Sequence, residues 1–146
     1  MTDLEKIKSW LLTCPETERL QGFRVDYLTR DPETGSIRPS GLVELSRTED
    51  ILGNATVENQ LNFGLYYVLS KSDDEASVQD NAQWVLNLQQ WVQKQSIQHF
   101  APTFGDDPRK ERMTAHSGAL YAENEDGTAT YLVQLTANYT KIYEVN

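Results

Sequence analysis

The residues of this chain that could do covalent chemistry are one cysteine and two histidines. Cys14 with His99 or His116 could act as a nucleophile with a base, because an imidazole activates a thiol for attack. Cys14, however, falls on an apolar stripe at helical spacing, where a thiol behaves as a small hydrophobic group. His99 follows a predicted helix end, where it can cap the last carbonyls, and His116 lies within a predicted strand. These positions favour structural roles, and two scattered histidines with one cysteine offer no metal-ligand spacing.

Clustered carboxylates are the second source of possible chemistry. Residues 73–75 are acidic and precede a predicted helix, where capping explains them. Residues 123–126 form a predicted hairpin tip without the spacing of an EF-hand calcium loop. Residues 104–108, which include Asp106 and Asp107, make the most site-like loop, although a simple turn explains them first. The glycines match neither the dinucleotide-binding nor the P-loop pattern, so we predict no catalytic residue, no metal and no cofactor.

Composition and charge narrow the class of protein further. The chain has 146 residues, enough for one core, and a formal net charge of −9 with no basic cluster to offset it. Nucleic acid and anionic membranes both require a basic surface, so neither is an expected partner. A single cysteine excludes an intrachain disulfide and fits a reducing cytoplasm. No apolar run approaches the roughly 20 residues that span a bilayer, and the N-terminus lacks a basic leader region. We expect a soluble cytoplasmic protein with a single domain over residues 1–146.

The first half of the chain predicts one helix followed by three strands. Thr2 and Glu5 form a capping box, apolar residues then repeat at helical spacing to Cys14, and Pro15 should end the helix. Strands are expected at residues 23–29, 41–45 and 61–70. The segments 30–35 and 47–55 are expected to be turns or connections. In the third strand one parity should face the core, namely Leu61, Phe63, Leu65, Tyr67 and Leu69.

The second half predicts a long helix and a hairpin. The helix should run over residues 74–95, with two tryptophans beside an apolar stripe of Val78, Ala82, Val85, Leu88 and Val92. Its opposite face is rich in glutamine (Gln79, Gln83, Gln90 and Gln93), which suggests solvent or a polar subunit contact. Residues 99–109 should be irregular, and two β-rich runs around Asp126-Gly127 predict a C-terminal hairpin. The expected class is therefore α+β: a mostly antiparallel sheet of about five strands with two main helices, in the order α-β-β-β-α-β-β.

A surplus of tyrosines in the predicted strands remains after the core is assigned. Alternation places some of them away from the core, and tyrosine is favoured at subunit contacts because its ring is large, stiff and amphipathic. Core packing accounts for part of the set. The candidate interface residues are Tyr66, Tyr131, Tyr139 and Tyr143.

The whole layout resembles the small tail-completion proteins of long-tailed phages and prophages of Gram-positive bacteria, also called tail terminators, minor tail or minor capsid components. The likeness lies in residues 4–15, 23–28, 83–92 and, most specifically, 126–135. It covers nearly the whole chain as a layout with diffuse motifs. The resemblance implies a virion structural protein that assembles in the bacterial host cytoplasm and resides in the virion tail.

The resemblance also implies partners. Such proteins form homo-oligomeric rings, commonly hexameric, that cap the tail tube, stop its polymerisation and join it to the head; the partners would be the tail tube protein and a head-completion protein. A ring uses one heterologous contact repeated until it closes. Two alternatives stay open: a head–tail connector or neck component, and a small ligand-binding or enzymatic domain that uses Asp106 and Asp107 with His99 or His116.

Overall fold

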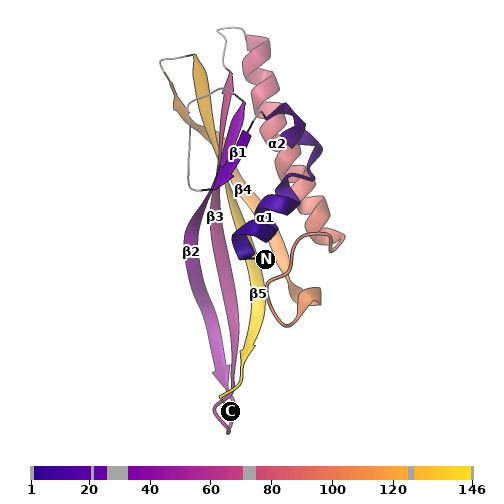
Figure 1. The fold of residues 1–146 in the computed structure, drawn as a ribbon, viewed down its shortest axis with the longest axis vertical. Helices are drawn as coiled ribbons and strands as arrows, with labels where there is room; N and C mark the ends of the chain where they lie inside the picture. Colours follow the sequence, from indigo (N-terminus) through magenta and orange to yellow (C-terminus); the bar gives the residue numbers. More distant parts are fainter. Residues whose placement is uncertain (1, 21, 26–32, 71–74, 125–126, 146) are drawn as a thin grey trace.

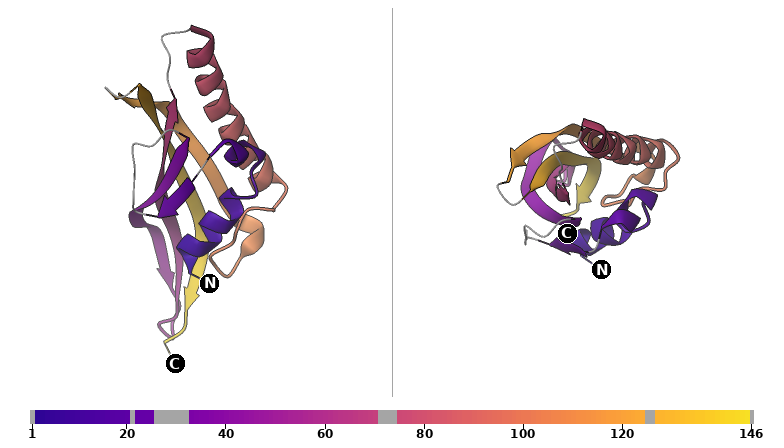
Figure 2. Two further views of the ribbon diagram at one scale, coloured as in Figure 1. Left: turned by 45° about the horizontal axis from the view of Figure 1, so that its top comes forward. Right: turned by 90° about the horizontal axis from the view of Figure 1, so that it is seen from above.

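The protein folds as one long twisted sheet with two helices on one of its faces (Figures 1 and 2). The structure is a computed structural model, and it describes residues 2–20, 22–25, 33–70, 75–124 and 127–145. The element order confirms the predicted α+β class and the predicted sequence of helices and strands. The elements are α1 (Asp3–Leu11), the 3₁₀ turn η1 (Pro15–Arg19), β1 (Gly22–Val25), β2 (Thr34–Glu49), β3 (Ala55–Ser70), α2 (Glu75–Ile97), the 3₁₀ turn η2 (Pro108–Lys110), β4 (Arg112–Glu123) and β5 (Thr128–Tyr143).

The described strands are arranged in the order β1-β2-β3-β5-β4. β1 pairs with β2 in parallel, and the remaining neighbours are antiparallel. β2, β3 and β5 are each 16 residues long, which is well above the usual strand length of about five or six residues. The three central strands therefore extend beyond the helices that cover the rest of the sheet (Figure 1).

α1 begins where its sequence predicts. The Thr2 hydroxyl accepts a hydrogen bond from the Glu5 amide at 3.2 Å, and the Glu5 carboxylate accepts one from the Thr2 amide at 3.4 Å, which completes the capping box. The helix ends at Leu11, earlier than the predicted stop at Pro15. Cys14 is extended, as a residue before proline prefers, and Pro15 starts η1.

The predicted core face of β3 is confirmed, and α2 packs above it. Phe63, Leu65, Tyr67 and Leu69 are buried beneath Trp84, Val85, Leu88 and Val92 of the helix, and Leu61, the fifth residue of the predicted face, is partly buried against the same core. The predicted stripe of α2 is wrong at Ala82, which is exposed, while Val78 lies outside the described side chains. Asn81 faces inward instead: its amide nitrogen donates to the Ser70 carbonyl at 2.9 Å, and its amide oxygen accepts from Arg19 at 2.8 Å.

β2 differs most from its prediction. The sequence predicted a turn at residues 30–35, a strand only at 41–45 and a connection at 47–55, but β2 runs continuously over Thr34–Glu49. Residues 30–32 of that turn, and residues 26–29 of the first predicted strand, lie outside the described residues. Pro39 is tolerated because β1 pairs only with the start of β2, so this part of β2 is a sheet edge. The pairing of β2 with β3 shifts register at two places, Pro39/Gly41 and Glu44/Ser46, as it does at β-bulges.

Candidate interaction surface

The structure does not assemble the residues that could have formed a nucleophilic site. Cys14 is 1% exposed, and burial raises the pKa of its thiol to about 11, so the thiol is neutral near pH 7. The His116 ring nitrogens lie 3.3 Å from the Ser117 hydroxyl and 3.4 Å from the Thr136 hydroxyl. Among the described residues, no hydrogen bond joins Cys14 to either histidine. Within residues 2–20, 22–25, 33–70, 75–124 and 127–145, no group of three or more histidine, cysteine or acidic residues could hold a metal ion.

The loop with Asp106 has a structural role that the sequence did not reveal. The Asp106 amide donates to the Thr140 carbonyl at 2.8 Å, and its carboxylate accepts from the Ile142 amide at 2.7 Å. Pairing between β4 and β5 begins only at Asn138, so Asp106 continues the hydrogen bonding of β5 where β4 is absent. Gly105 permits this approach, because a Cβ there would lie 2.1 Å from the Thr140 oxygen. We call residues 104–111 the clasp.

Glu111 connects the two ends of the clasp. Its carboxylate accepts hydrogen bonds from the backbone amides of Phe104 at 2.7 Å and Gly105 at 3.2 Å. The Asp107 carboxylate lies 3.7 Å from the Lys110 ammonium on the exposed surface. Asp106 and Glu111 are thus both engaged with backbone amides.

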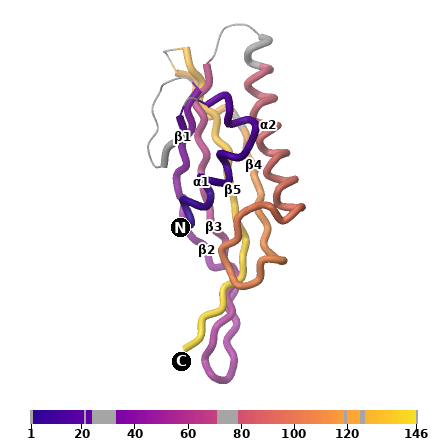
Figure 3. Tube along the Cα trace, turned by 45° about the vertical axis from the view of Figure 1, so that its right-hand side comes forward, coloured from indigo at the N-terminus to yellow at the C-terminus, as the bar shows by residue number. Residues whose placement is uncertain are grey.

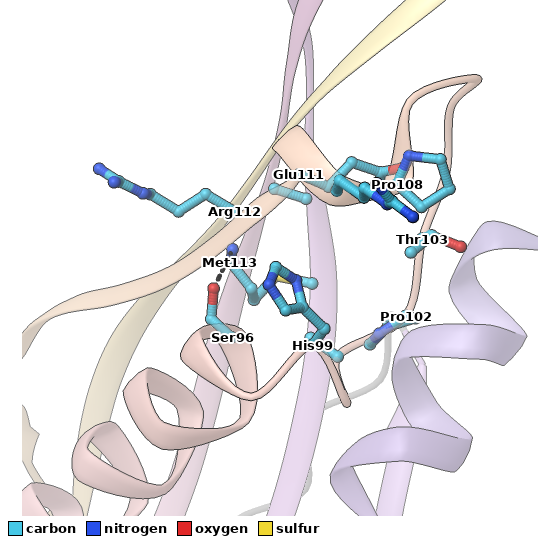
Figure 4. A pocket seen from close by; sticks show the side chains of 11 residues that line it. Ser96, His99, Pro102, Thr103, Pro108, Glu111, Arg112 and Met113 are labelled. Atoms are coloured by element: carbon cyan, nitrogen blue, oxygen red, sulfur yellow. Dashed lines mark hydrogen bonds between the residues drawn. The ribbon is translucent and has the colours of Figure 1, made fainter.

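A small cavity lies beside the clasp, between the end of α2 and the start of β4 (Figure 4). His99, Arg109 and Met113 are among its lining residues, and the Met113 amide donates to the Ser96 hydroxyl at 2.9 Å. Its volume of about 140 Å³ is well below the roughly 300–1,000 Å³ of typical ligand pockets. Neither aspartate of the clasp lines it, and His116 lines a different hollow on the sheet. The structure therefore does not bring Asp106 and Asp107 together with a histidine.

The four candidate interface tyrosines occupy different environments. Tyr131 is 7% exposed and belongs to the core, so its ring offers little area to a second subunit. Tyr66 stacks edge-on against Tyr121, with ring centroids 5.6 Å apart. Tyr139 packs against Phe104 of the clasp, and partial burial raises the pKa of its phenol. Tyr143 is 52% exposed near the C-terminal end of β5.

Tyr143 belongs to a larger exposed surface at the end of the sheet. The strands β2, β3 and β5 run past both helices there and form a three-stranded extension, seen at the bottom of Figures 1 and 3. We call residues 41–60 and 138–145 the arm. Every residue from 39 to 52 is exposed. The arm carries eight exposed large apolar side chains: Leu42, Val43, Leu45, Ile51, Leu52, Ile142, Tyr143 and Val145.

Local hydrogen bonds connect the strands and the turn of the arm, which no α-helix covers. In the turn between β2 and β3, the Asp50 carboxylate accepts hydrogen bonds from the Leu52 and Asn54 amides at 2.9 Å each. Gly53 supplies the positive φ of 88° that this turn requires. The Asn54 side chain then accepts from the Val145 amide at 3.1 Å, which ties the end of the chain to the turn. The exposed apolar side chains therefore project from a backbone that these hydrogen bonds hold in place.

A second uncovered apolar surface lies between α2 and β4. Leu86 and Ile97 are 49% and 71% exposed on α2, and Met113 and Ala115 of β4 contribute to the floor. Glutamines Gln89, Gln90 and Gln93 are part of its wall, and its volume is about 390 Å³. We call it the α2–β4 groove. No charged residue is among those that line it.

Sequence reasoning found neither surface as a unit. The sequence predicts a short apolar strand at residues 41–45 and places Gln90 and Gln93 on a helix face for solvent or a subunit contact. Both glutamines are exposed. None of the helices in the described ranges is long and apolar enough to cross a membrane. No protein-family model matches the sequence, and no curated protein matches it either.

Proposed function

We propose that this chain is a non-enzymatic assembly protein of a long-tailed phage or prophage, which forms a homo-oligomeric ring that caps the tail tube and joins it to the head. The observation that carries the proposal is the arm. Eight large apolar side chains are exposed on the two faces and the tip of this extension, and a concentration of exposed apolar groups of this kind is typical of a surface that binds another protein. A subunit of an assembly needs such a surface.

Three other features support the proposal. The resemblance of residues 4–15 and 126–135 to tail-completion proteins points to this class. The side chains that could have formed a catalytic site are instead buried, as for Cys14, or bound to backbone amides, as for Asp106. The charge of −9 is compatible with protein partners and opposes nucleic acid binding.

The resemblance implies a ring, and a ring needs a heterologous contact, in which one surface of a copy binds a different surface of the next copy. Such a contact either closes into a ring or continues as a filament. Tail tubes end in a closed ring rather than in an open filament, so of these two forms we propose the ring. The partners would then be further copies of this chain, the tail tube protein and a head-completion protein.

Negative-stain electron microscopy of the purified protein tests the ring. We expect closed annular particles with a central hole. Fields that contain only single protomers or open filaments at micromolar concentration would contradict the proposal.

A head–tail connector is the nearest alternative, since it too forms a ring at the junction. Immunogold labelling with an antibody against this chain separates the two after induction of the phage. A tail terminator should label the ends of free, headless tails, whereas a connector should label tailless heads.

A further inference from the structure

The face of the sheet opposite to the helices carries a polar hollow. Side chains alternate along a strand, so the even-numbered residues 60–66 of β3 and 132–138 of β5 point away from the core beneath α1 and α2. We call these residues, with those opposite them in β2 and β4, the open face. The hollow lies in its middle and has a volume of about 240 Å³. Asn62, Gln134 and His116 are among the residues that line it.

The strand register places an arginine and a histidine at opposite ends of one row across the open face. Arg38 of β2 is opposite Gly64, Gly64 is opposite Gln134, and Gln134 is opposite His116 of β4. This row is about 14 Å long, because it spans three strand spacings of about 4.8 Å. Arg112 lies four residues before His116 and adds a second guanidinium to the same face.

Aromatic rings position the Arg38 side chain. Its guanidinium carbon lies 5.0 Å from the ring centroid of Tyr66, which lines the hollow and contacts Tyr121 edge-on. The Tyr66 ring also lies against Gly64, where a Cβ would be only 3.0 Å from it. Arg38 Nε is buried without a hydrogen-bond partner, and in the part of the chain that the structure describes Arg38 forms no ion pair. An anion at this guanidinium would supply the missing acceptor.

A hydrogen-bonded wall faces Arg38 across the hollow. The Thr136 hydroxyl donates to the side-chain oxygen of Asn62 at 3.1 Å, and His116 Nε2 lies 3.4 Å from the Thr136 oxygen. Because the Thr136 hydrogen points to Asn62, the Thr136 oxygen accepts from His116 Nε2–H. These groups are therefore arranged before a ligand binds, as polar groups that orient ligands usually are.

The charges of the open face favour an acidic ligand. The chain as a whole has a net charge of −9. In the rows between Ser36 and Val43, however, the described side chains include Arg38, Arg112 and His116 and no carboxylate. An acidic group is therefore attracted to this face, although the rest of the protein repels it.

The size and spacing of the site favour a protein segment over a free metabolite. The volume of about 240 Å³ is below the roughly 300–1,000 Å³ of typical ligand pockets. Arg112 is a further four residues along β4 from the row of Arg38, or about 14 Å, so a small anion reaches only one guanidinium. Tyr66 and Tyr121 lie between them, and tyrosine and arginine are enriched where proteins bind each other.

From these observations we propose that the open face binds an acidic, extended segment of a partner protein. One carboxylate of the segment lies on the Arg38 guanidinium, and the chain crosses the hollow toward His116 and Arg112. The site is complete on a single protomer, so this inference goes beyond the proposed ring and does not depend on it.

Isothermal titration calorimetry with the peptide hexaglutamate tests the site. Low ionic strength is used, because exposed charges are then least screened. The net charge of the protein repels this peptide, so binding requires a local cationic site. Glutarate, which resembles one glutamate side chain, and oligothymidylate, which carries phosphates, are titrated in parallel.

Two substitutions alter the site, and each has a matched control. Arg38→Gln removes the guanidinium, and Gln134→Glu places a carboxylate at an exposed position of the hollow. Arg109→Gln removes an exposed guanidinium from the clasp, and Gln79→Glu adds a carboxylate to an exposed position of α2. Circular dichroism and thermal melting check that each variant is folded.

We expect the parent to bind hexaglutamate, with an affinity that falls as salt is added. Arg38→Gln and Gln134→Glu should each weaken binding by about tenfold or more, because the first removes a charge-assisted hydrogen bond and the second opposes it. Arg109→Gln and Gln79→Glu should bind within about twofold of the parent, because their charges are remote from the hollow.

The contrary results are equally specific. No binding by the parent, unchanged binding by Arg38→Gln, or an equal loss in each variant and its control would overturn the inference. Glutarate that binds as tightly as hexaglutamate would show that the site takes a small carboxylate. Oligothymidylate that binds more tightly than hexaglutamate would show that it takes phosphates. Either of these two results would overturn the protein segment as the ligand.

Discussion

The clasp gives the sharpest test of whether Asp106 is a structural or a catalytic residue. Asp106→Ala removes the acceptor of the Ile142 amide hydrogen bond of 2.7 Å, and the neighbouring bond from the Asp106 amide to Thr140 should persist. A hydrogen bond to a charged group contributes roughly 1.5–3 kcal/mol when it is protected from water, and less at an exposed position. Because Asp106 is exposed, we expect a loss of about 1 kcal/mol in the free energy of unfolding.

Urea denaturation followed by tryptophan fluorescence measures this loss. Asp107→Ala is the matched control, because the neighbouring carboxylate has only a surface contact of 3.7 Å with Lys110 and should change stability by less than about 0.5 kcal/mol. Asp106→Asn keeps a side-chain oxygen acceptor and should recover part of the loss. Equal midpoints for Asp106→Ala and Asp107→Ala would refute the role assigned to the clasp. The assembly of Asp106→Ala should match the parent.

Three further predictions concern the helices and the cysteine. Val85→Asp buries an unpaired charge and should lower the free energy of unfolding, measured by urea denaturation, by about 3–5 kcal/mol. Ala82→Asp, on the exposed side of α2, should lower it by less than about 1 kcal/mol. Similar losses for the two variants would show that α2 presents a different face to the core. His99 lies two residues after the end of α2 and has a φ of 61°. His99→Gly should therefore raise the free energy of unfolding by about 0.5–1 kcal/mol, and His99→Ala should give no such gain. Burial raises the pKa of the Cys14 thiol from 9.0 to about 11, so the unfolded chain loses this proton at a lower pH than the folded chain does. Relative to Cys14→Ala, the free energy of unfolding of the parent should therefore fall by up to about 3 kcal/mol between pH 9 and pH 11. Parallel pH profiles of the two proteins would contradict the burial of the thiol.

Short sequence patterns correctly predicted the elements that interactions between neighbouring residues stabilise. Thr2 and Glu5 are three residues apart, and their mutual hydrogen bonds begin α1 as expected. The alternation in β3 correctly placed Phe63 and Tyr67 in the core. In such cases the pattern of a few neighbouring residues already contains the physical reason for the structure.

The failures come from contacts between distant residues. Thr34 and Gly35 belong to the predicted turn at residues 30–35, but they pair with Val68 and Tyr67 of β3 and begin β2, because a long partner strand outweighs the local preference. Asn81 faces inward because Arg19 and Ser70, far away in the sequence, satisfy its amide. Asp106 bonds to Ile142 across 36 residues, which no spacing rule detects.

The candidate surfaces could be predicted only in part. The apolar residues Leu42, Val43 and Leu45 indicate a strand, but no sequence pattern indicates that the helices stop short of this strand and leave it exposed. Tyr143 was named as an interface residue and lies on the arm, while Tyr131, named with it, is in the core. Alternation assigns a side chain to a face of the sheet; whether that face is covered depends on the tertiary arrangement.

We propose that copies of this chain assemble through their own surfaces into a closed ring. Multi-angle light scattering over a concentration series tests it most directly, because a closed ring has a fixed mass, whereas open association grows with concentration. For a hexameric ring we expect a plateau near 100 kDa, which is about six protomers of 16.7 kDa. A mass that stays at one protomer throughout the series, or that rises without a plateau, would contradict it.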